Sequence, residues 1–161
     1  MPDDRGDSAR HTAQFLRLKG PAERGHPAAQ HGLANMYSNG QGVARDEAAA
    51  VAWYRKAAEQ GYARAQFNLG LRYDNGQGVP QDYGQAQLWY RKAAEQGYPG
   101  AQYHLGLLYD AGHGVPMDHQ EAIFWYRKAA DQGHLRAQFD LGLRYETGRG
   151  VPMDLRKAML W

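Results

Sequence analysis

A unit of 36 residues repeats through most of the chain without insertion or deletion. The unit that begins at Ala65 recurs at Ala101 and Ala137 and can be traced back to Ala29, and the segment WYRKAAEQGY occurs twice without change. In such an array each unit is one supersecondary element, which buries its apolar face against its neighbours. Residues that recur in the same column of every repeat are therefore expected to be structural. Functional residues are expected in surface columns, or where one repeat departs from the others.

The repeat register predicts how the chain is divided. We expect a disordered tail plus a degenerate capping helix over 1–28, three full repeats over 29–64, 65–100 and 101–136, and a truncated fourth repeat over 137–161. Within the first part, residues 13–25 loosely match a second helix, and residues 1–8 are expected to be disordered.

Each repeat is expected to form a hairpin of two helices. Ala65, Leu69 and Tyr73 fall at helical spacing, and Gly76 is placed to end the first helix in the left-handed conformation. The second helix is expected to begin after an aspartate N-cap, which recurs as Asp46, Asp82, Asp118 and Asp154. Glycines in the first helices (Gly70, Gly106 and Gly142) are expected to let two helices approach closely.

The aromatic residues follow the same register. All four tryptophans share one column, and two further columns hold seven of the eleven tyrosines. Aromatic side chains at helical spacing usually pack layers of a fold together, so these columns are predicted to form the core.

The pattern A-Q-x-x-L-G-x-x-Y-x-x-G-x-G-V-P-x-D-x-x-x-A-x-x-W-Y-x-K-A-A-x-Q-G resembles the Sel-one-like repeat (SLR), a relative of the tetratricopeptide repeat (TPR). The resemblance implies an all-α, right-handed superhelix of antiparallel helix pairs, with the first helices lining the concave face. It also implies work as a scaffold or adaptor through protein partners. Some cysteine-rich relatives are linked to binding or hydrolysing penicillin-like compounds, but the cysteines that distinguish them are missing from this chain.

The outer face of the first helices is the predicted partner-binding surface. Projection at 100 degrees per residue places three rows opposite the buried stripe: an aromatic row, a leucine row and an acidic row. The candidate residues are Arg64, Phe67, Asn68, Leu71, Asp74, Tyr103, His104, Leu107, Asp110, Arg136, Phe139, Leu143 and Glu146. A row of exposed leucines is a reasonable mark of a protein-binding groove.

Each row also has a structural interpretation, and both alternatives stay open at this point. Phe67, Tyr103 and Phe139 either face a partner or pack against the helix of a neighbouring repeat. The acids either select a basic peptide or simply keep the groove solvated. A closed pocket among Tyr103, His104 and Asp140 would favour a small cell-wall or peptidic ligand instead.

The last repeat stops at Trp161, part of the way through its second helix. Ala158, Leu160 and Trp161 are expected to be partly uncovered there, because the ends of such arrays normally carry a polar cap. Two readings remain: the array is shortened at this point, or this end is covered by another chain, including a second copy.

Several other functions find little support in the sequence. A net charge of +2, spread evenly over the repeats, does not favour nucleic-acid binding. The chain has no cysteine, and His104, His113 and His119 lack metal-ligand spacing, so no metal or cofactor is expected. No catalytic constellation is visible, and we expect a protein that is not an enzyme. The polar amino terminus and the absence of an apolar run predict a cytoplasmic protein without membrane insertion.

Overall fold

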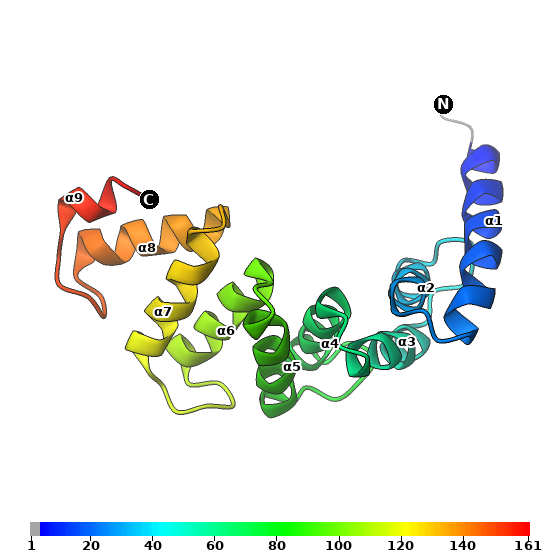
Figure 1. The fold of residues 1–161 in the computed structure, drawn as a ribbon, viewed down its shortest axis with the longest axis horizontal. Coiled ribbons are helices and arrows are strands. Elements are labelled where there is room, and N and C mark those ends of the chain that lie inside the picture. The colour runs from blue at the N-terminus through cyan, green and yellow to red at the C-terminus, as the bar shows by residue number, and fades with distance from the viewer. Residues whose placement is uncertain (1–3) are drawn as a thin grey trace. The chain divides into compact units, whose positions relative to one another are not determined.

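The computed structural model describes residues 4–161, with side chains from residue 7 onward, and every regular element in that range is an α-helix. The helices are α1 (Asp4–Glu23), α2 (Pro27–Asn39), α3 (Glu47–Glu59), α4 (Ala63–Asn75), α5 (Tyr83–Glu95), α6 (Pro99–Ala111), α7 (His119–Ala130), α8 (Leu135–Thr147) and α9 (Leu155–Ala158) (Figure 1). The predicted all-α fold of repeating helical hairpins is confirmed.

The chain divides into two compact units, and the boundary along the sequence lies between Asp82 and Tyr83. In the first unit α2 packs against α1 and α3, and α3 packs against α4. In the second unit each helix from α5 to α9 packs against the next one along the chain. Each unit therefore contains one complete hairpin with a helix packed on either side of it, α2 with α3 and α6 with α7, and the second unit adds α9 after α8.

Short-range signals define the helix ends. The side chain of Asp46 accepts a hydrogen bond from the backbone N–H of Ala49 at 2.9 Å, and Asp118 and Asp154 cap α7 and α9 in the same way. The predicted N-caps are confirmed at these three positions, while that of Asp82 stays a prediction. First helices end at glycines in the left-handed conformation, as expected for Gly76, whose φ is 64°.

Most residues of the predicted core columns are buried, although Tyr37 and Tyr109 of one tyrosine column are half-buried. Among the largest fully buried side chains are Tyr54, Tyr90 and Tyr126 from the second helices and Leu33, Leu69, Leu105 and Leu141 from the first helices. Trp89 and Trp125 are also buried, whereas Trp53 and Trp161 are only partly covered. Gly106 lies so close to Tyr126 that an added Cβ would stand 2.7 Å from the ring, which confirms the close approach predicted for this column.

A glutamine in each first helix ties it to the end of the helix before it. Gln30, Gln66, Gln102 and Gln138 each donate a side-chain hydrogen bond of 3.1 Å to the carbonyl group eight residues earlier. For Gln30 that carbonyl group belongs to Ala22 of α1. Helix α1 therefore occupies the place of a second helix ahead of the first full repeat.

The expected disorder at the amino terminus is wrong for residues 4–8, which are helical, and Met1 to Asp3 lie outside the described residues. Asp7 lies near the start of α1, where a negative charge interacts favourably with the helix dipole, and it also pairs with Arg10 at 3.8 Å. Thr12 donates a hydrogen bond to the carbonyl group of Ser8. These local interactions are available to a polar segment that lacks any apolar pattern.

Across residues 4–161, no helix combines the length and the apolar character needed to cross a membrane.

Candidate functional site

The predicted outer face of the first helices contains both buried and exposed side chains. Phe139 and Leu143 of α8 are 69% and 47% exposed, and Arg64, Arg136 and Glu146 are exposed as well. Phe67, Asn68, Leu71, Asp74, His104, Leu107 and Asp110 are half-buried, and Tyr103 is buried. The side chains of these rows therefore differ in exposure, and the sequence pattern does not predict which of them are accessible.

The aromatic row packs between repeats at Tyr103. Its ring stacks on His134 with a centroid distance of 4.8 Å and lies 5.6 Å from the ring of Tyr126, and its hydroxyl donates a 3.0 Å hydrogen bond to Asp140. Burial and the hydrogen bond to the Asp140 carboxylate raise the pKa of Tyr103 to about 12. Tyr103 is thus packed against the neighbouring repeat, as the structural alternative for this row expects.

The acidic row is occupied by internal ion pairs at Asp110. Its carboxylate accepts from Arg144 at 2.5 Å and lies 2.7 Å from Nδ1 of His119, with Arg149 at 3.7 Å. Burial alone would raise the pKa of Asp110, but hydrogen bonds from Arg144 and His119 outweigh that effect and hold it below its usual value. Asp110 therefore does not present a free negative charge to a basic peptide.

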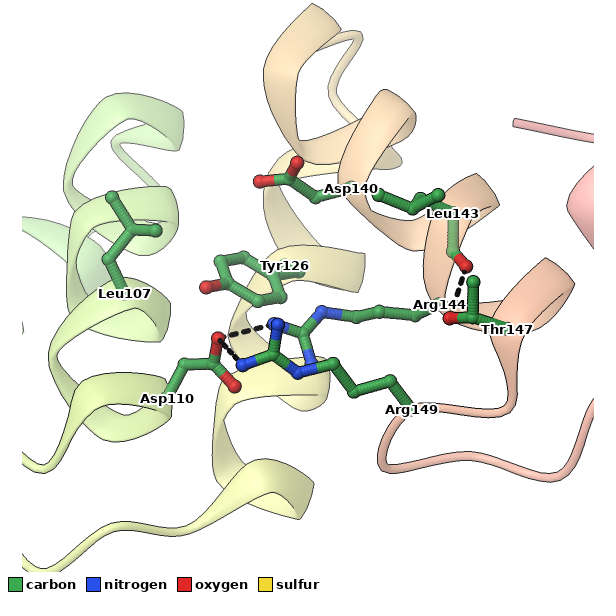
Figure 2. A pocket seen from close by; sticks show the side chains of 8 residues that line it. All are labelled: Leu107, Asp110, Tyr126, Asp140, Leu143, Arg144, Thr147 and Arg149. Atoms are coloured by element: carbon green, nitrogen blue, oxygen red, sulfur yellow. Dashed lines mark hydrogen bonds and ion pairs between the residues drawn. The ribbon is translucent and has the colours of Figure 1, made fainter.

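A cavity of about 460 Å³ lies between α6 and α8, and Tyr126 of α7 forms part of its wall (Figure 2). It is lined by Leu107 and Asp110 of α6, Tyr126 of α7, Asp140, Leu143, Arg144 and Thr147 of α8, and Arg149 of the turn that follows. Figure 2 shows Arg144 and Arg149 extending from the α8 side toward Asp110, while the hydroxyl of Tyr126 points toward the α6 side. Three predicted residues, Leu107, Asp110 and Leu143, come together here.

Two polar atoms of this wall have no hydrogen-bond partner. Oη of Tyr126 and Nη1 of Arg144 are both buried and unpaired, and the guanidinium of Arg144 lies 5.0 Å from the centroid of the Tyr126 ring. Burial, followed by the nearby charge of Asp110, raises the pKa of Tyr126, so its hydroxyl stays protonated and is available as a donor. Unpaired buried polar groups are uncommon in folded proteins and call for an explanation.

The first unit contains the same arrangement two repeats earlier, with these atoms paired. Tyr54 donates a 2.6 Å hydrogen bond to Oδ1 of Asn35. Arg72 donates through Nη1 to Glu47 and Gln77 and through Nη2 to Ser38, which leaves Nε as its unpaired nitrogen. The hydrogen bonds of Tyr54 and Arg72 can therefore be compared directly with those of Tyr126 and Arg144 in the second unit.

The contrast between Tyr54 and Tyr126 predicts opposite effects of removing the hydroxyl. Tyr54→Phe should lower the free energy of unfolding by about 1 kcal/mol, because a hydrogen bond is lost and Asn35 is left unpaired. Tyr126→Phe should raise it by about 1 kcal/mol, because a buried donor without an acceptor is removed. Urea denaturation of the two variants and the parent measures both values. Destabilisation of the same size in both would show that the Tyr126 hydroxyl has a partner.

Arg72, Arg144 and Tyr126 were not predicted as site residues. The arginines share a first-helix column with Met36 and Leu108, and this alternation of charged and apolar residues is the signal that marks the column as unusual. The tyrosines recur in each of the three full repeats, so the column itself does not distinguish them. Tyr126 lies two repeats after Tyr54, and the hydrogen bonding of the two hydroxyl groups differs because the neighbouring residues differ.

The carboxyl-terminal end gathers most of the residues predicted for self-association. A second cavity of about 370 Å³ is lined by Leu135, Gln138, Phe139, Gly142, Leu143, Glu146, Ala158 and Trp161. Leu160 is 78% exposed and lines a separate hollow with Arg127 and Lys157.

Two other candidate arrangements behave differently in the structure. Asp140 lines the larger cavity, but Tyr103 is turned into the repeat interface, and the ring of His104 lies 5.2 Å from that of Tyr90. Tyr103 and His104 therefore pack against neighbouring rings, and Asp140 contributes to the larger cavity. Within the described part of the chain, no group of three or more histidine, aspartate and glutamate side chains is arranged to hold a metal ion.

Comparison with known proteins gives consistent matches. The family model described as Sel1 repeat matches residues 27–62, 63–98, 99–134 and 135–161, so each match begins two residues ahead of the repeat register given above. No match to this chain is found among curated proteins.

Solved structures of similar sequence include two bacterial repeat proteins. A protective antigen of uropathogenic Escherichia coli strains that displays an SLR fold is 46% identical over 91% of this chain, with a TM-score of 0.89. A Sel1 repeat protein from Oxalobacter formigenes is 43% identical over 90% of this chain, with a TM-score of 0.83. The chain spans 32% and 60% of the lengths of these two proteins. Cysteine rich protein B of Helicobacter pylori shares the fold, with 22% identity over 84% of this chain, 96% of its own length covered and a TM-score of 0.61.

Proposed function

Because the chain belongs to the Sel1 repeat family, we propose that it is a scaffold that binds a protein partner along the outer face of its first helices. Proteins built from Sel1 repeats generally mediate protein–protein interactions. In this chain the relevant helices are α2 and α4 in the first unit and α6 and α8 in the second unit.

The observation that supports this proposal best is the apolar surface of α8. Leu143 is 47% exposed and lines the larger cavity as well as the second cavity beside Ala158 and Trp161. Phe139, 69% exposed, lies one helical turn before it. Exposed apolar side chains next to hollows of this size are typical of surfaces that bind other proteins.

A small peptidic ligand is the second candidate, and the volume of the larger cavity favours it. About 460 Å³ lies within the range of small-molecule sites, roughly 300 to 1,000 Å³. A protein partner would contact the outer face of several first helices, whereas a short ligand would contact only the residues that line the cavity.

The proposed function is tested by a triple substitution, Leu71→Glu, Leu107→Glu and Leu143→Glu. It should reduce capture of native partners at least tenfold, because three carboxylates would face an apolar segment of the partner. Leu88→Glu is the matched control, since Leu88 is 40% exposed on α5, a second helix. Quantitative pull-down with circular dichroism of each variant gives the result. Capture by the triple variant at the level of the parent would argue against this surface.

A further inference from the structure

The cavity between α6 and α8 has donors without acceptors. Oη of Tyr126 and Nη1 of Arg144 are unpaired, while the carboxylates on the same wall already accept hydrogen bonds. Asp110 accepts from Arg144 at 2.5 Å, and Asp140 accepts from Tyr103 at 3.0 Å. A ligand that offers a hydrogen-bond acceptor to these two groups would therefore bind more favourably than a ligand that offers another donor.

Three residue changes between the two units account for the unpaired donors. Asn35, the acceptor for Tyr54, is matched by Leu107 two repeats later, which cannot accept a hydrogen bond. Glu47 and Gln77, the acceptors for Nη1 of Arg72, are matched by His119 and Arg149. The second unit has therefore lost the acceptors of both groups and kept Tyr126 and Arg144 themselves.

The charge and shape of the cavity narrow the choice of acceptor. Arg149 adds a second guanidinium group, which is 64% exposed and only loosely paired with Asp110 at 3.7 Å. Guanidinium groups form strong, charge-assisted hydrogen bonds with carboxylates. Leu107 and Leu143 supply apolar walls that fit methylene groups and a neighbouring apolar side chain. The tyrosine hydroxyl stays protonated beside them, so it also acts as a donor.

We propose that this cavity binds a glutamate side chain of a protein partner, with its carboxylate on Arg144, Arg149 and Tyr126 and its methylene groups between Leu107 and Leu143. This assignment rests on the proposed scaffold function, and it specifies which side chain of the partner enters the cavity. The partner segment therefore contains an acidic residue next to an apolar one. Its charge is opposite to that of the basic peptide suggested by the acidic row in the sequence.

The first test is a titration of the full chain with capped tripeptides, followed by NMR of the backbone amides of α6, α7 and α8. Acetyl-Leu-Glu-Leu-amide should bind about tenfold more tightly than acetyl-Leu-Gln-Leu-amide, since only the former offers a charged acceptor. Equal affinity for these two probes would overturn the assignment to a carboxylate. Tighter binding of acetyl-Leu-Leu-Leu with a free terminal carboxylate would overturn the assignment to a side chain.

Substitutions taken from the first unit sharpen this test. Leu107→Asn supplies the acceptor that Tyr54 has in Asn35, and Arg149→Gln restores the residue found at Gln77. Each should weaken binding of the glutamate probe about tenfold, because the donors become satisfied internally or lose a charge. Tyr54→Phe changes the first unit alone and should leave the affinity of the probe unchanged. Undiminished binding by both Leu107→Asn and Arg149→Gln would remove the cavity from consideration.

The two proposals fail in different ways. Capture of a native partner that depends on the three leucines but is unaffected by Arg149→Gln would overturn the glutamate site and leave the scaffold function standing. Loss of preference for the glutamate probe in Arg149→Gln, with native capture unchanged by Leu71→Glu alone, would support the site and contradict a binding surface that extends along the first helices, because Leu71 does not line the cavity.

Discussion

Gly78→Ala is expected to lower the free energy of unfolding by roughly 3 kcal/mol, whereas Gly61→Ala should lower it by only about 1 kcal/mol. Both glycines have positive φ, 72° for Gly78 and 85° for Gly61, so alanine is strained at each of them. They differ in their surroundings. A Cβ at Gly78 would stand 2.4 Å from the backbone oxygen of Glu47, while a Cβ at Gly61 meets nothing within 4 Å.

The larger effect at Gly78 arises because the turn after each first helix rests on the second helix of the preceding repeat. Gly42 and Gly114 make the same close approach to the backbone of His11 and Tyr83, whereas a Cβ at Gly150 would stand 3.0 Å from the side chain of His119. Relief of the clash at Gly78 requires movement of backbone, which moves one repeat relative to the next. Chemical denaturation followed by far-ultraviolet circular dichroism gives both values. Equal losses of unfolding free energy in the two variants would show that φ strain alone explains the effect, and that the close approach at Gly78 adds nothing.

Local features of this fold follow from the sequence because each depends on residues within one hairpin. Asp46, Asp118 and Asp154 cap helices that begin immediately after them, and Gly76 ends the helix that precedes it. The leucine and tyrosine core columns follow from helical periodicity alone. A regular repeat makes these signals stronger, since each prediction is made several times in the same chain.

The chemistry of the candidate site could not be predicted in the same way, because it depends on which repeats meet. Asp110 is paired with Arg144, which lies 34 residues further along, and Tyr103 with Asp140, 37 residues further. A projection of a single helix places Asp110 on an outer face, but it does not include the helix that stacks against that face. At Asp110 the predicted acidic edge is therefore an internal ion pair, and the buried Arg144 that pairs with it was not predicted.

The repeat also makes the unpaired donors of the second unit interpretable. Tyr54 and Tyr126 occupy the same column in similar helices, so a difference in their hydrogen bonding reflects their neighbours and not the fold. In the first unit the wall is satisfied by Asn35, Glu47 and Gln77, which favours stability. In the second unit stability is reduced at the positions where a ligand would supply the missing acceptors.

Leu141→Ala and Leu143→Ala should separate folding from binding on a single helix. Leu141 is fully buried and packs in a cluster with Ile123 and Tyr126, so its truncation leaves a cavity and should lower the free energy of unfolding by about 3 kcal/mol. Leu143 is 47% exposed on the opposite side of α8, and its truncation should change stability by no more than about 0.5 kcal/mol. Urea denaturation of both variants measures these values.

Binding should respond in the reverse order. Leu143→Ala removes an apolar wall of the cavity and should weaken binding of the glutamate probe severalfold, whereas folded Leu141→Ala should bind it like the parent. The two substitutions are chemically identical and lie two residues apart, so intrinsic helix propensity cannot explain a difference between them. A stability loss at Leu143 as large as that at Leu141 would mean that the outer face of α8 is part of the core. That result would contradict the proposal that this face binds a partner.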